Sequence, residues 1–507
     1  MLLSRRVTTP HLVDLAVILA YLAAITWFGA RFRHSQHSLR DYFLGGRNAP
    51  WWAISFSIVS AETSTLTVIG TPALSFGGNF EFLQVVFGYL LARVAISTLF
   101  LPHYFRGEMF TAYELMRRRF GERMRRFTAG TFLILRALAE GVRAFALSIV
   151  IGVILEPLYR KIGVSGWAEA GSILLIVALT LFYTFEGGMS AVIWTDVVQM
   201  VLYVGGAVLS FFIILGQIPG GWAHVASVAG AAGKLQVFDF RFAFTAAFFA
   251  RNYSFWAGLA GGCFLTTASH GTEQLMVQRY LAARSERDAR KALFSSWLVI
   301  FFQFTLFLVI GAMLFVHYSD RHLPAPKPLD TIYPAFVWNN LPAGVAGLVI
   351  AAILAAGMSN LSAALNALAS TSIMDFYRPL FGRPGMSEAY FLRLARWATV
   401  VWGAALFAIG QVARHWGSVL EAGLSIASVL YGSLLGVFFL GLLTRRVGQN
   451  AAMIAMITGL LLMVYVKMGT TIAFTWWVPI GTIATFAVGL ALSFVIREKV
   501  LAADEHR

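Results

Sequence analysis

The stretch Ala53-Ile-Ser-Phe-Ser-Ile-Val-Ser-Ala-Glu-Thr-Ser-Thr-Leu-Thr67 decides the fold, because it places hydroxyl groups and an acid inside an apolar run. The run covers about residues 52–77, which is enough for one membrane span, since about 20 residues cross the hydrocarbon core. A polar or ionisable side chain is costly at that depth, so Glu62 and its neighbours mark a functional segment. Gly70 and Pro72 follow the cluster. We therefore predict an interrupted spanning helix here.

A second apolar run, at about residues 246–275, has the same character. It contains Thr266-Thr-Ala-Ser-His-Gly-Thr-Glu-Gln274, a polar segment with a glycine at its centre. The two runs lie five spans apart. Interrupted helices at corresponding positions of two halves indicate an inverted-repeat transporter with a binding site near the bilayer midplane. The alternative is a pair of helix-packing faces, because small and hydroxyl residues also bring membrane helices together.

The composition of the whole chain agrees with a membrane protein. Of 507 residues, 58% are hydrophobic and 12% are charged, whereas soluble domains carry about 25% charged residues. The single cysteine, Cys263, excludes a disulfide-stapled secreted domain. We predict an all-α polytopic protein with about thirteen transmembrane helices, forming one transmembrane domain over residues 1–507. The candidate spans are 11–31, 52–77, 80–104, 127–155, 169–185, 190–216, 246–275, 293–317, 343–375, 391–412, 418–443, 450–467 and 474–496.

The basic residues indicate an orientation. The formal net charge is +15, and Lys and Arg gather in alternate loops such as 106–126 and 279–291. This pattern is typical of the positive-inside rule rather than of nucleic-acid binding, so the expected partner is the lipid bilayer. We predict a multi-pass protein of the cell membrane with its C-terminus in the cytoplasm. Thirteen spans then place the N-terminus outside.

The apolar run at 343–375 carries a row of oxygen-bearing side chains. Ser359 and Ser362 lie three residues apart and share one face of the expected helix. A hard monovalent cation prefers several oxygen ligands, which hydroxyls and the carbonyls of an unwound helix would supply together. The alternative is a helix-packing face.

Asp196 lies about one turn into the run at 190–216. A buried anion at this depth would neutralise a cation pathway. The alternative is that its carboxylate caps the start of the helix.

Arginines are also expected inside the membrane. Arg136, Glu140 and Arg143 follow one another at helical spacing in the run 127–155, and Arg93 lies within the run 80–104. Arginine binds carboxylates through two parallel hydrogen bonds, so an excess of buried arginine favours a solute that bears a carboxylate. The alternative is an internal ladder of ion pairs in which Glu140 serves both arginines.

Sequence signatures of an enzyme are absent. The chain has no H-E-x-x-H, no Cys/His cluster and no G-x-x-x-x-G-K-[ST], and no loop is long enough for a catalytic domain. We therefore expect a transporter, neither a membrane-embedded enzyme nor a solute sensor, since about ten residues follow the last expected span. Proton coupling stays open, because Glu62, Glu273 and His270 are titratable.

Six stretches, taken in order and spacing, resemble the sodium/solute symporter family. This family includes bacterial proline, galactose and sialic acid symporters and animal glucose, iodide and monocarboxylate cotransporters. The matching stretches are Asp41-Tyr-Phe-Leu-Gly-Gly-Arg47, Ser60-Ala-Glu62, Gly187-Gly-Met-Ser-Ala-Val-Ile-Trp-Thr-Asp196, Val277-Gln-Arg-Tyr-Leu-Ala-Ala-Arg284, Ala356-Gly-Met-Ser-Asn-Leu-Ser-Ala-Ala-Leu-Asn366 and Met374-Asp-Phe-Tyr377.

The resemblance implies a LeuT-type core of 5+5 inverted repeats with discontinuous second and seventh helices. The repeats fall at about 52–216 and 246–443, and the peripheral helices at 11–31, 450–467 and 474–496. It also implies sodium-driven import of a small organic solute by alternating access, with no obligatory protein partner evident. A proton-coupled or sugar symporter of the same fold is the alternative.

The resemblance further implies a sodium site between the first interrupted helix and the run at 343–375. By motif position, the ligands are the carbonyls of Phe56, Val59 and Ala356 with the side chains of Ser359 and Asn360. The departure is Asn360, where the family pattern has serine or threonine.

A second cation site in some family members resembles Asp196, Ser359 and Ser362. The next position here is Ala363, which argues against a second sodium ion. Asp196 and Ser362 are therefore our candidates for coupling.

For the solute, the polar ring of the galactose transporter is mostly missing. Thr63 stands where the pattern has glutamine, and Val86 and Tyr89 replace polar residues, so a sugar is disfavoured. The predicted solute contacts are Ser60, Glu62, Thr63, Tyr89, Arg136, Arg143, Thr266, Ser269 and His270.

Overall fold

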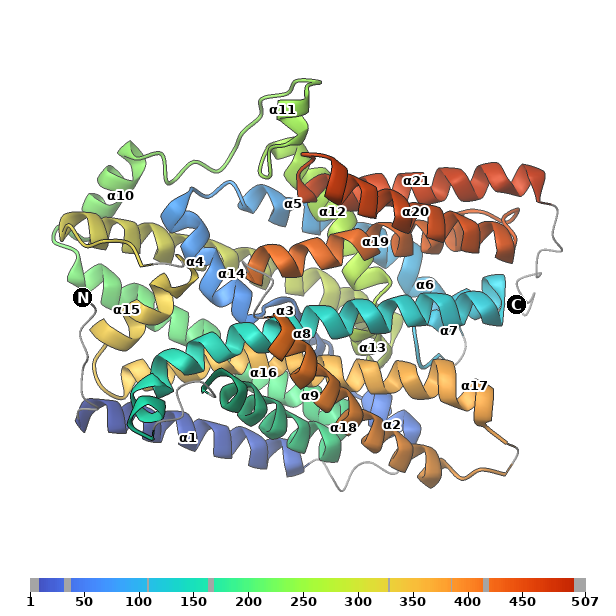
Figure 1. Cartoon of the computed structure of the whole chain (residues 1–507), viewed down its shortest axis with the longest axis horizontal. Helices are drawn as coiled ribbons and strands as arrows, with labels where there is room; N and C mark the ends of the chain where they lie inside the picture. Colours follow the sequence, from blue (N-terminus) through green and yellow to red (C-terminus); the bar gives the residue numbers. More distant parts are fainter. Residues whose placement is uncertain are drawn as a thin grey trace.

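The computed structural model describes residues 9–31, 38–106, 109–162, 168–326, 329–383, 385–413 and 419–496. Within these ranges the protein is a bundle of helices with no β-strand (Figure 1). The helices before the centre of the chain are α1 (Thr9–Ala30), α2 (Leu39–Leu44), η2 (Gly45–Arg47), α3 (Trp51–Glu62), α4 (Thr65–Gly77), α5 (Leu83–Ala95), η3 (Ile96–Phe100), α6 (Leu101–Tyr104), α7 (Tyr113–Phe120), α8 (Glu122–Ile162), α9 (Ala168–Gln217), α10 (Gly221–Ala231) and α11 (Ala246–Phe249).

The second half continues in the same way. Its helices are α12 (Phe255–Gly271), α13 (Gln274–Leu281), α14 (Glu286–Asp320), η5 (Leu329–Thr331), α15 (Ile332–Asn340), α16 (Val345–Thr371), η6 (Ser372–Tyr377), α17 (Arg378–Phe381), α18 (Glu388–Ala413), α19 (Val419–Leu443), α20 (Gln449–Gly469) and α21 (Phe474–Val495).

Many of these helices suit a membrane. Among the described residues, eight helices are long and apolar enough to cross a bilayer, and a ninth span forms if α3 and α4 count together. Shorter apolar helices cover Leu12–Phe28 and Ala170–Phe182. The all-helical, polytopic architecture is thus confirmed, and the count of about thirteen spans stays a prediction.

The interruption predicted in the first polar run is present. Helix α3 ends at Glu62, and Thr63 and Ser64 adopt extended backbone angles before α4 begins. The Ser64 side chain accepts a hydrogen bond from the backbone N–H of Thr67, which caps the new helix. The two helices meet at a bend of 62°.

The second predicted interruption is also present. Helix α12 ends at Gly271, Glu273 has extended backbone angles of φ −84° and ψ 134°, and α13 starts at Gln274. Both polar runs therefore contain a break in the helix where hydroxyl, amide and carboxylate groups cluster.

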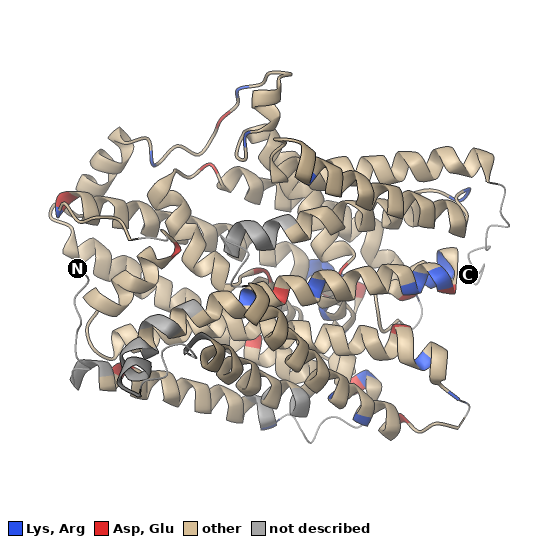
Figure 2. Cartoon of the chain, in the orientation of Figure 1, with Lys and Arg blue, Asp and Glu red and all other residues tan. Residues whose placement is uncertain are grey.

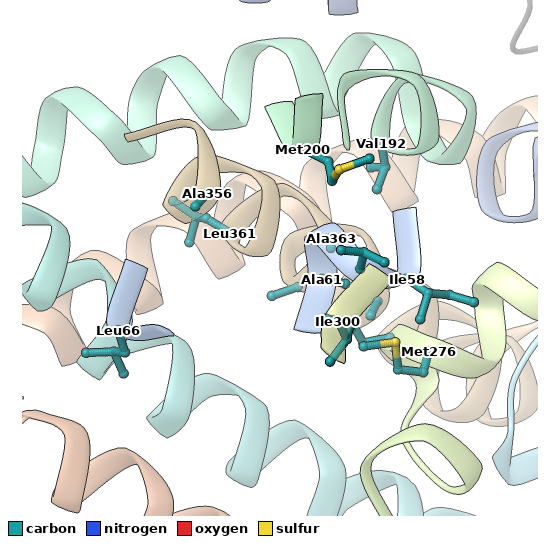
Figure 3. Close-up of a cluster of buried hydrophobic side chains, with 14 of the residues drawn as sticks. Ile58, Ala61, Leu66, Val192, Met200, Met276, Ile300, Ala356, Leu361 and Ala363 are labelled. Carbon is teal, nitrogen blue, oxygen red and sulfur yellow. The ribbon is translucent and has the colours of Figure 1, made fainter. Parts of the chain in front are cut away.

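Helix α16 lies at the centre of the bundle. In its most apolar stretch 94% of the residues are buried, compared with 28% in α18. Buried side chains of α3, α13, α14 and α16 meet beside the break, among them Ile58, Met276, Ile300 and Ala363 (Figure 3). The break in α3–α4 therefore packs directly against α16.

The first helix is joined to α16 through a buried carboxylate. Oδ1 of Asp14 in α1 accepts hydrogen bonds from the backbone N–H groups of Gly344 (2.7 Å) and Gly347 (2.8 Å) at the start of α16. A Cβ atom at Gly347 would lie 2.7 Å from the Cα of Asp14, so glycine is required for this approach. The first turn of α16 is therefore capped from a different helix.

We expect Asp14→Ala to lower stability by about 1 kcal/mol, because two buried N–H groups lose their acceptor. Asp14→Asn keeps an acceptor oxygen and should retain most of the stability. The measurement is thermal unfolding of the detergent-purified protein. Equal unfolding temperatures for the alanine variant and the wild type would contradict the capping role.

Charged side chains are unevenly distributed (Figure 2). Lys and Arg gather at the end of the bundle that holds α7 and the first turns of α8 and α18. A smaller group of charged residues lies in the middle of the bundle. These residues form part of the candidate site.

Candidate functional site

Asn360 connects α16 to the break between α3 and α4. Its Nδ2 donates hydrogen bonds to the carbonyl oxygens of Thr63 (2.6 Å), Ser60 (3.2 Å) and Ala356 (3.3 Å). Asn360 is completely buried, and its Oδ1 has no hydrogen-bond partner among the described residues. The residue that departs from the family pattern therefore makes direct contact with the unwound backbone.

A second amide reaches the break from α14. Nε2 of Gln303 donates to Oγ1 of Thr63 at 2.6 Å, and Gln303 is 2% exposed. Gln303 was not among the predicted site residues. It is nevertheless a polar residue inside the apolar run 293–317, so the rule that identified Glu62 would also have found it.

Asp196 of α9 is fully buried and binds residues of three other helices. Its carboxylate accepts hydrogen bonds from the hydroxyls of Ser57 in α3 (2.5 Å) and Ser359 in α16 (2.6 Å) and from Nη2 of Arg279 in α13 (2.7 Å). A helix cap would instead bind backbone N–H groups of its own helix. The geometry therefore supports the interpretation of Asp196 as a buried anion in the site.

The ion pair between Asp196 and Arg279 corrects one expectation. Arg279 was assigned to a basic loop, yet it lies in α13 and is 1% exposed. Its other nitrogens donate to the Ser57 hydroxyl (2.8 Å) and the Leu275 carbonyl (2.7 Å). The helix after the second break continues to Leu281. Arg279 is able to lie buried in it because an acid on another helix neutralises its charge.

The predicted residues Ser60 and Ser359 face each other across the break, with their hydroxyl oxygens 2.5 Å apart. The hydroxyl of Ser362 donates instead to the carbonyl of Ser359 in its own helix (2.9 Å). The carbonyl of Val59 accepts from the Thr63 N–H at 2.9 Å. Of the five predicted sodium ligands, Ala356, Ser359 and Asn360 lie next to Ser60 and Thr63. Ser60 and Thr63 follow the other two predicted ligands, Phe56 and Val59, by about one helical turn.

Several predicted solute contacts form one network at the end of α3. Glu62 pairs with Arg93 of α5 (2.6 Å) and with Nε2 of His270 in α12 (3.2 Å). The hydroxyl of Ser269 lies 2.8 Å from Nδ1 of His270. The guanidinium of Arg93 stands over the ring of Tyr89, 5.8 Å from its centre. Thr266 is buried one turn before His270 in the same helix.

The arginines of α8 have more acidic partners than expected. Arg136 pairs with Glu140 (2.5 Å) and also with Glu273 at the second break (3.4 Å), and Arg143 pairs with Glu140. The excess of positive charge that Arg136, Glu140 and Arg143 give to α8 is thus balanced by Glu273, which comes from a distant part of the chain. The two arginines differ in exposure, with 27% of the side chain of Arg143 accessible and 4% of that of Arg136.

Comparisons with known proteins agree with this architecture. The model of the sodium:solute symporter family matches residues 42–459. The chain is 29% identical to a sodium/sialic acid symporter of Aliivibrio fischeri, covering 93% of this chain and 91% of the relative. It is 26% identical to the bovine sodium-coupled monocarboxylate transporter 2, covering 93% and 75%, and 26% identical to the human sodium/iodide cotransporter, covering 88% and 67%.

Solved structures give the same result. A substrate-bound, outward-open Na⁺-coupled sialic acid symporter superimposes with a TM-score of 0.84 at 26% identity, covering 96% of this chain and 98% of that one. A nucleobase-cation-symport-1 family transporter shares the fold, with a TM-score of 0.56 at 13% identity and coverage of 89% and 93%.

Proposed function

The chain belongs to the sodium:solute symporter family, and from this premise we propose that it imports a small carboxylate-bearing solute with sodium by alternating access. The family consists of sodium-coupled membrane transporters, so the chain is a transporter and not an enzyme. The observation that carries the proposal is the meeting of the broken span α3–α4 with α16 and the buried carboxylate of Asp196.

The oxygen atoms at this meeting point are the proposed ligands of sodium. Unwound backbone at membrane depth is stable where it lines a site, and its carbonyls are suitable ligands for a small hard cation. Ser359 and Asn360 are the side chains of α16 that face the break. Asp196 supplies a negative charge near these atoms, and in this conformation its carboxylate forms an ion pair with Arg279.

The carboxylate preference rests on Arg143. Each buried arginine described above forms an ion pair with an acidic residue of the protein. The cost of burying an unpaired arginine is therefore not an argument for an anionic solute. Arg143 is the partly accessible one and shares Glu140 with Arg136, so it is able to bind a second carboxylate. The similarity to a bacterial sialic acid symporter and to an animal monocarboxylate transporter is consistent with such a solute.

We also propose the inverted repeat, the thirteen spans and the orientation with the N-terminus outside and the C-terminus in the cytoplasm. The recurrence of broken helices at Glu62 and Gly271 supports the repeat. The basic end of the bundle near α7 supports the orientation (Figure 2).

Uptake into proteoliposomes tests the function directly. We expect an inward sodium gradient to drive solute accumulation, and an equal potassium gradient to leave the solute at equilibrium. The solute is chosen beforehand from a thermal-shift panel of carboxylates, amino acids and sugars, each measured in sodium and in potassium. Stabilisation by neutral sugars alone, or accumulation driven by a proton gradient without sodium, would contradict the proposal.

Ser359→Ala tests the contribution of α16 to sodium coupling. It should raise the sodium concentration for half-maximal uptake by roughly fivefold, because the loss of one buried oxygen contact costs about 1 kcal/mol. The matched control is Ser148→Ala in α8, a buried hydroxyl that donates to the Phe145 carbonyl of its own helix. Sodium activation that is identical in Ser359→Ala and the wild type would remove Ser359 from the proposed site.

A further inference from the structure

The chain between α10 and α11 carries a phenylalanine at every second position. Residues 237–244 read Val-Phe-Asp-Phe-Arg-Phe-Ala-Phe. Side chains two residues apart lie on the same side of an extended chain, so these rings are able to form one row. They are 44, 59, 62 and 86% exposed, in the order Phe238, Phe240, Phe242 and Phe244. An apolar surface of this kind usually marks an interaction site.

Asp239 fixes this row of rings to the bundle. It is 4% exposed, and its carboxylate forms ion pairs with Arg241 (2.7 Å) and Arg251 (2.7 Å). Its backbone N–H donates to Oε1 of Gln84 in α5 (2.9 Å), and its carbonyl accepts from the N–H of Phe255 at the start of α12 (2.8 Å). The exposed rings therefore belong to a segment that is tied to two helices.

The ends of two other helices set the depth of this segment in the membrane. The carbonyl of Phe249 in α11 accepts a hydrogen bond from the N–H of Ala473 (2.8 Å), in the turn between α20 and α21. The ring of Phe249 lies 5.3 Å from that of Trp476. Both α20 and α21 are long and apolar enough to cross a bilayer, so the turn between them lies at the membrane surface. The segment that ends in α11 is held at the same level.

The direction of this segment is the second observation. In Figure 1 the long helices run across the view, whereas α11 and the chain before it stand out sideways at the upper edge, beside α12 and α21. A segment that leaves a membrane bundle sideways, at the level of the helix ends, meets the lipid headgroups.

The row of rings is also continuous with the sides of spanning helices. The ring of Phe87 in α5 lies 5.8 Å from that of Phe238 and 5.6 Å from that of Phe301 in α14. The next residue of α14, Phe302, is 63% exposed on the side of a spanning helix. Trp256 in α12 contacts the ring of Phe242 (5.7 Å) and is 41% exposed. The rings thus extend a surface that lipid already covers.

We propose that residues 237–249 and Trp256, here called the aromatic anchor, rest in the headgroup region of the bilayer, with their rings at the boundary to the acyl chains. Aromatic rings are favoured at this boundary. The backbone of the anchor stays outside the hydrocarbon, since lipid-exposed irregular chain does not occur there.

The anchor determines the membrane position of the outer end of α12, which is the first half of the second broken helix. In the proposed orientation the lipid is the outer leaflet. This inference concerns a lipid contact and goes beyond the proposed transport function.

A nitroxide spin label at position 244 tests the proposal in the full-length protein, reconstituted in vesicles of phosphatidylethanolamine and phosphatidylglycerol. Phe244→Cys is made in a Cys263→Ser background, because Cys263 is the only cysteine of the chain. Oxygen concentrates in the hydrocarbon and a neutral nickel chelate in water, so the ratio of the two collision rates with the label measures its depth.

Two matched label sites give the scale. Phe302→Cys on α14 is the reference inside the bilayer, and Ala325→Cys, at an exposed position in the linker after α14, is the reference in water. We expect the oxygen-to-nickel ratio at position 244 to be several-fold higher than at position 325 and lower than at position 302. Phe240→Cys, at a second exposed ring of the anchor, should give the same result, and it replaces Phe244→Cys if that variant does not reconstitute.

Two results would overturn the inference. A ratio at position 244 equal to that at position 325 would place the anchor in water. Protection of the label from both oxygen and the nickel chelate would show that protein covers the rings, for example a second copy of this chain. Neither result depends on sodium, so the proposed function would stand in both cases.

Discussion

Asp196→Asn is expected to abolish most sodium-driven uptake and to lower stability by about 3–5 kcal/mol. The carboxylate of Asp196 is fully buried and neutralises Arg279 at 2.7 Å. Asparagine preserves the shape but leaves the guanidinium buried without a countercharge, which is the costly way to break such a pair. Uptake in proteoliposomes and thermal unfolding in detergent measure the two effects.

The double variant Asp196→Asn, Arg279→Met separates coupling from stability. With both charges removed, stability should recover by most of the lost amount, because a buried ion pair is often replaceable by neutral residues. Sodium-driven uptake should stay low, because the negative charge next to the ion is still missing. Recovery of both stability and uptake would show that the pair is purely structural.

Arg143→Lys is expected to weaken the binding of a carboxylate solute by about tenfold with little loss of stability. Lysine keeps the charge but not the planar fork that binds both oxygens of a carboxylate. A factor of ten corresponds to about 1.4 kcal/mol, which is within the usual range for a hydrogen bond to a charged group. Solute-dependent thermal shifts and uptake kinetics provide the affinity.

Arg136→Lys is the comparison for this prediction. Arg136 has only 4% of its side chain accessible and lies between Glu140 and Glu273. Arg136→Lys should therefore mainly lower the unfolding temperature, with little effect on solute affinity. Equal losses of solute affinity in both variants would contradict the assignment to Arg143, and transport of neutral sugars alone would contradict the carboxylate itself.

The sequence was sufficient for features that depend on local chemistry. The breaks after Glu62 and Gly271 were predictable because hydroxyl and acidic groups are rare inside spanning helices. Family motifs then identified the symporter architecture, and the structure places Ser359 and Asn360 against the first break.

Contacts between distant segments were not predictable in the same way. Asp196 pairs with Arg279, and Arg136 with Glu273, across 83 and 137 residues of sequence. No local spacing relates such residues. The sequence therefore placed Arg279 in a loop, and it did not reveal the acid that balances the positive charge of α8. The direction of the Asn360 amide likewise depends on the carbonyls of another helix.

The balance of these charges has a consequence for the electrical behaviour of transport. Among the described residues discussed here, Arg93, Arg136, Arg143 and Arg279 are matched by four carboxylates, those of Glu62, Glu140, Asp196 and Glu273. Their sum is zero, so in the proposed cycle these eight side chains together move no net charge through the membrane field when the carrier reorients. Over a complete cycle the carrier returns to its starting state, so the charge moved per cycle equals the charge of the cargo. One sodium ion with a monocarboxylate would be electrically silent, whereas one sodium ion with a zwitterionic amino acid would carry one positive charge inward and respond to membrane voltage.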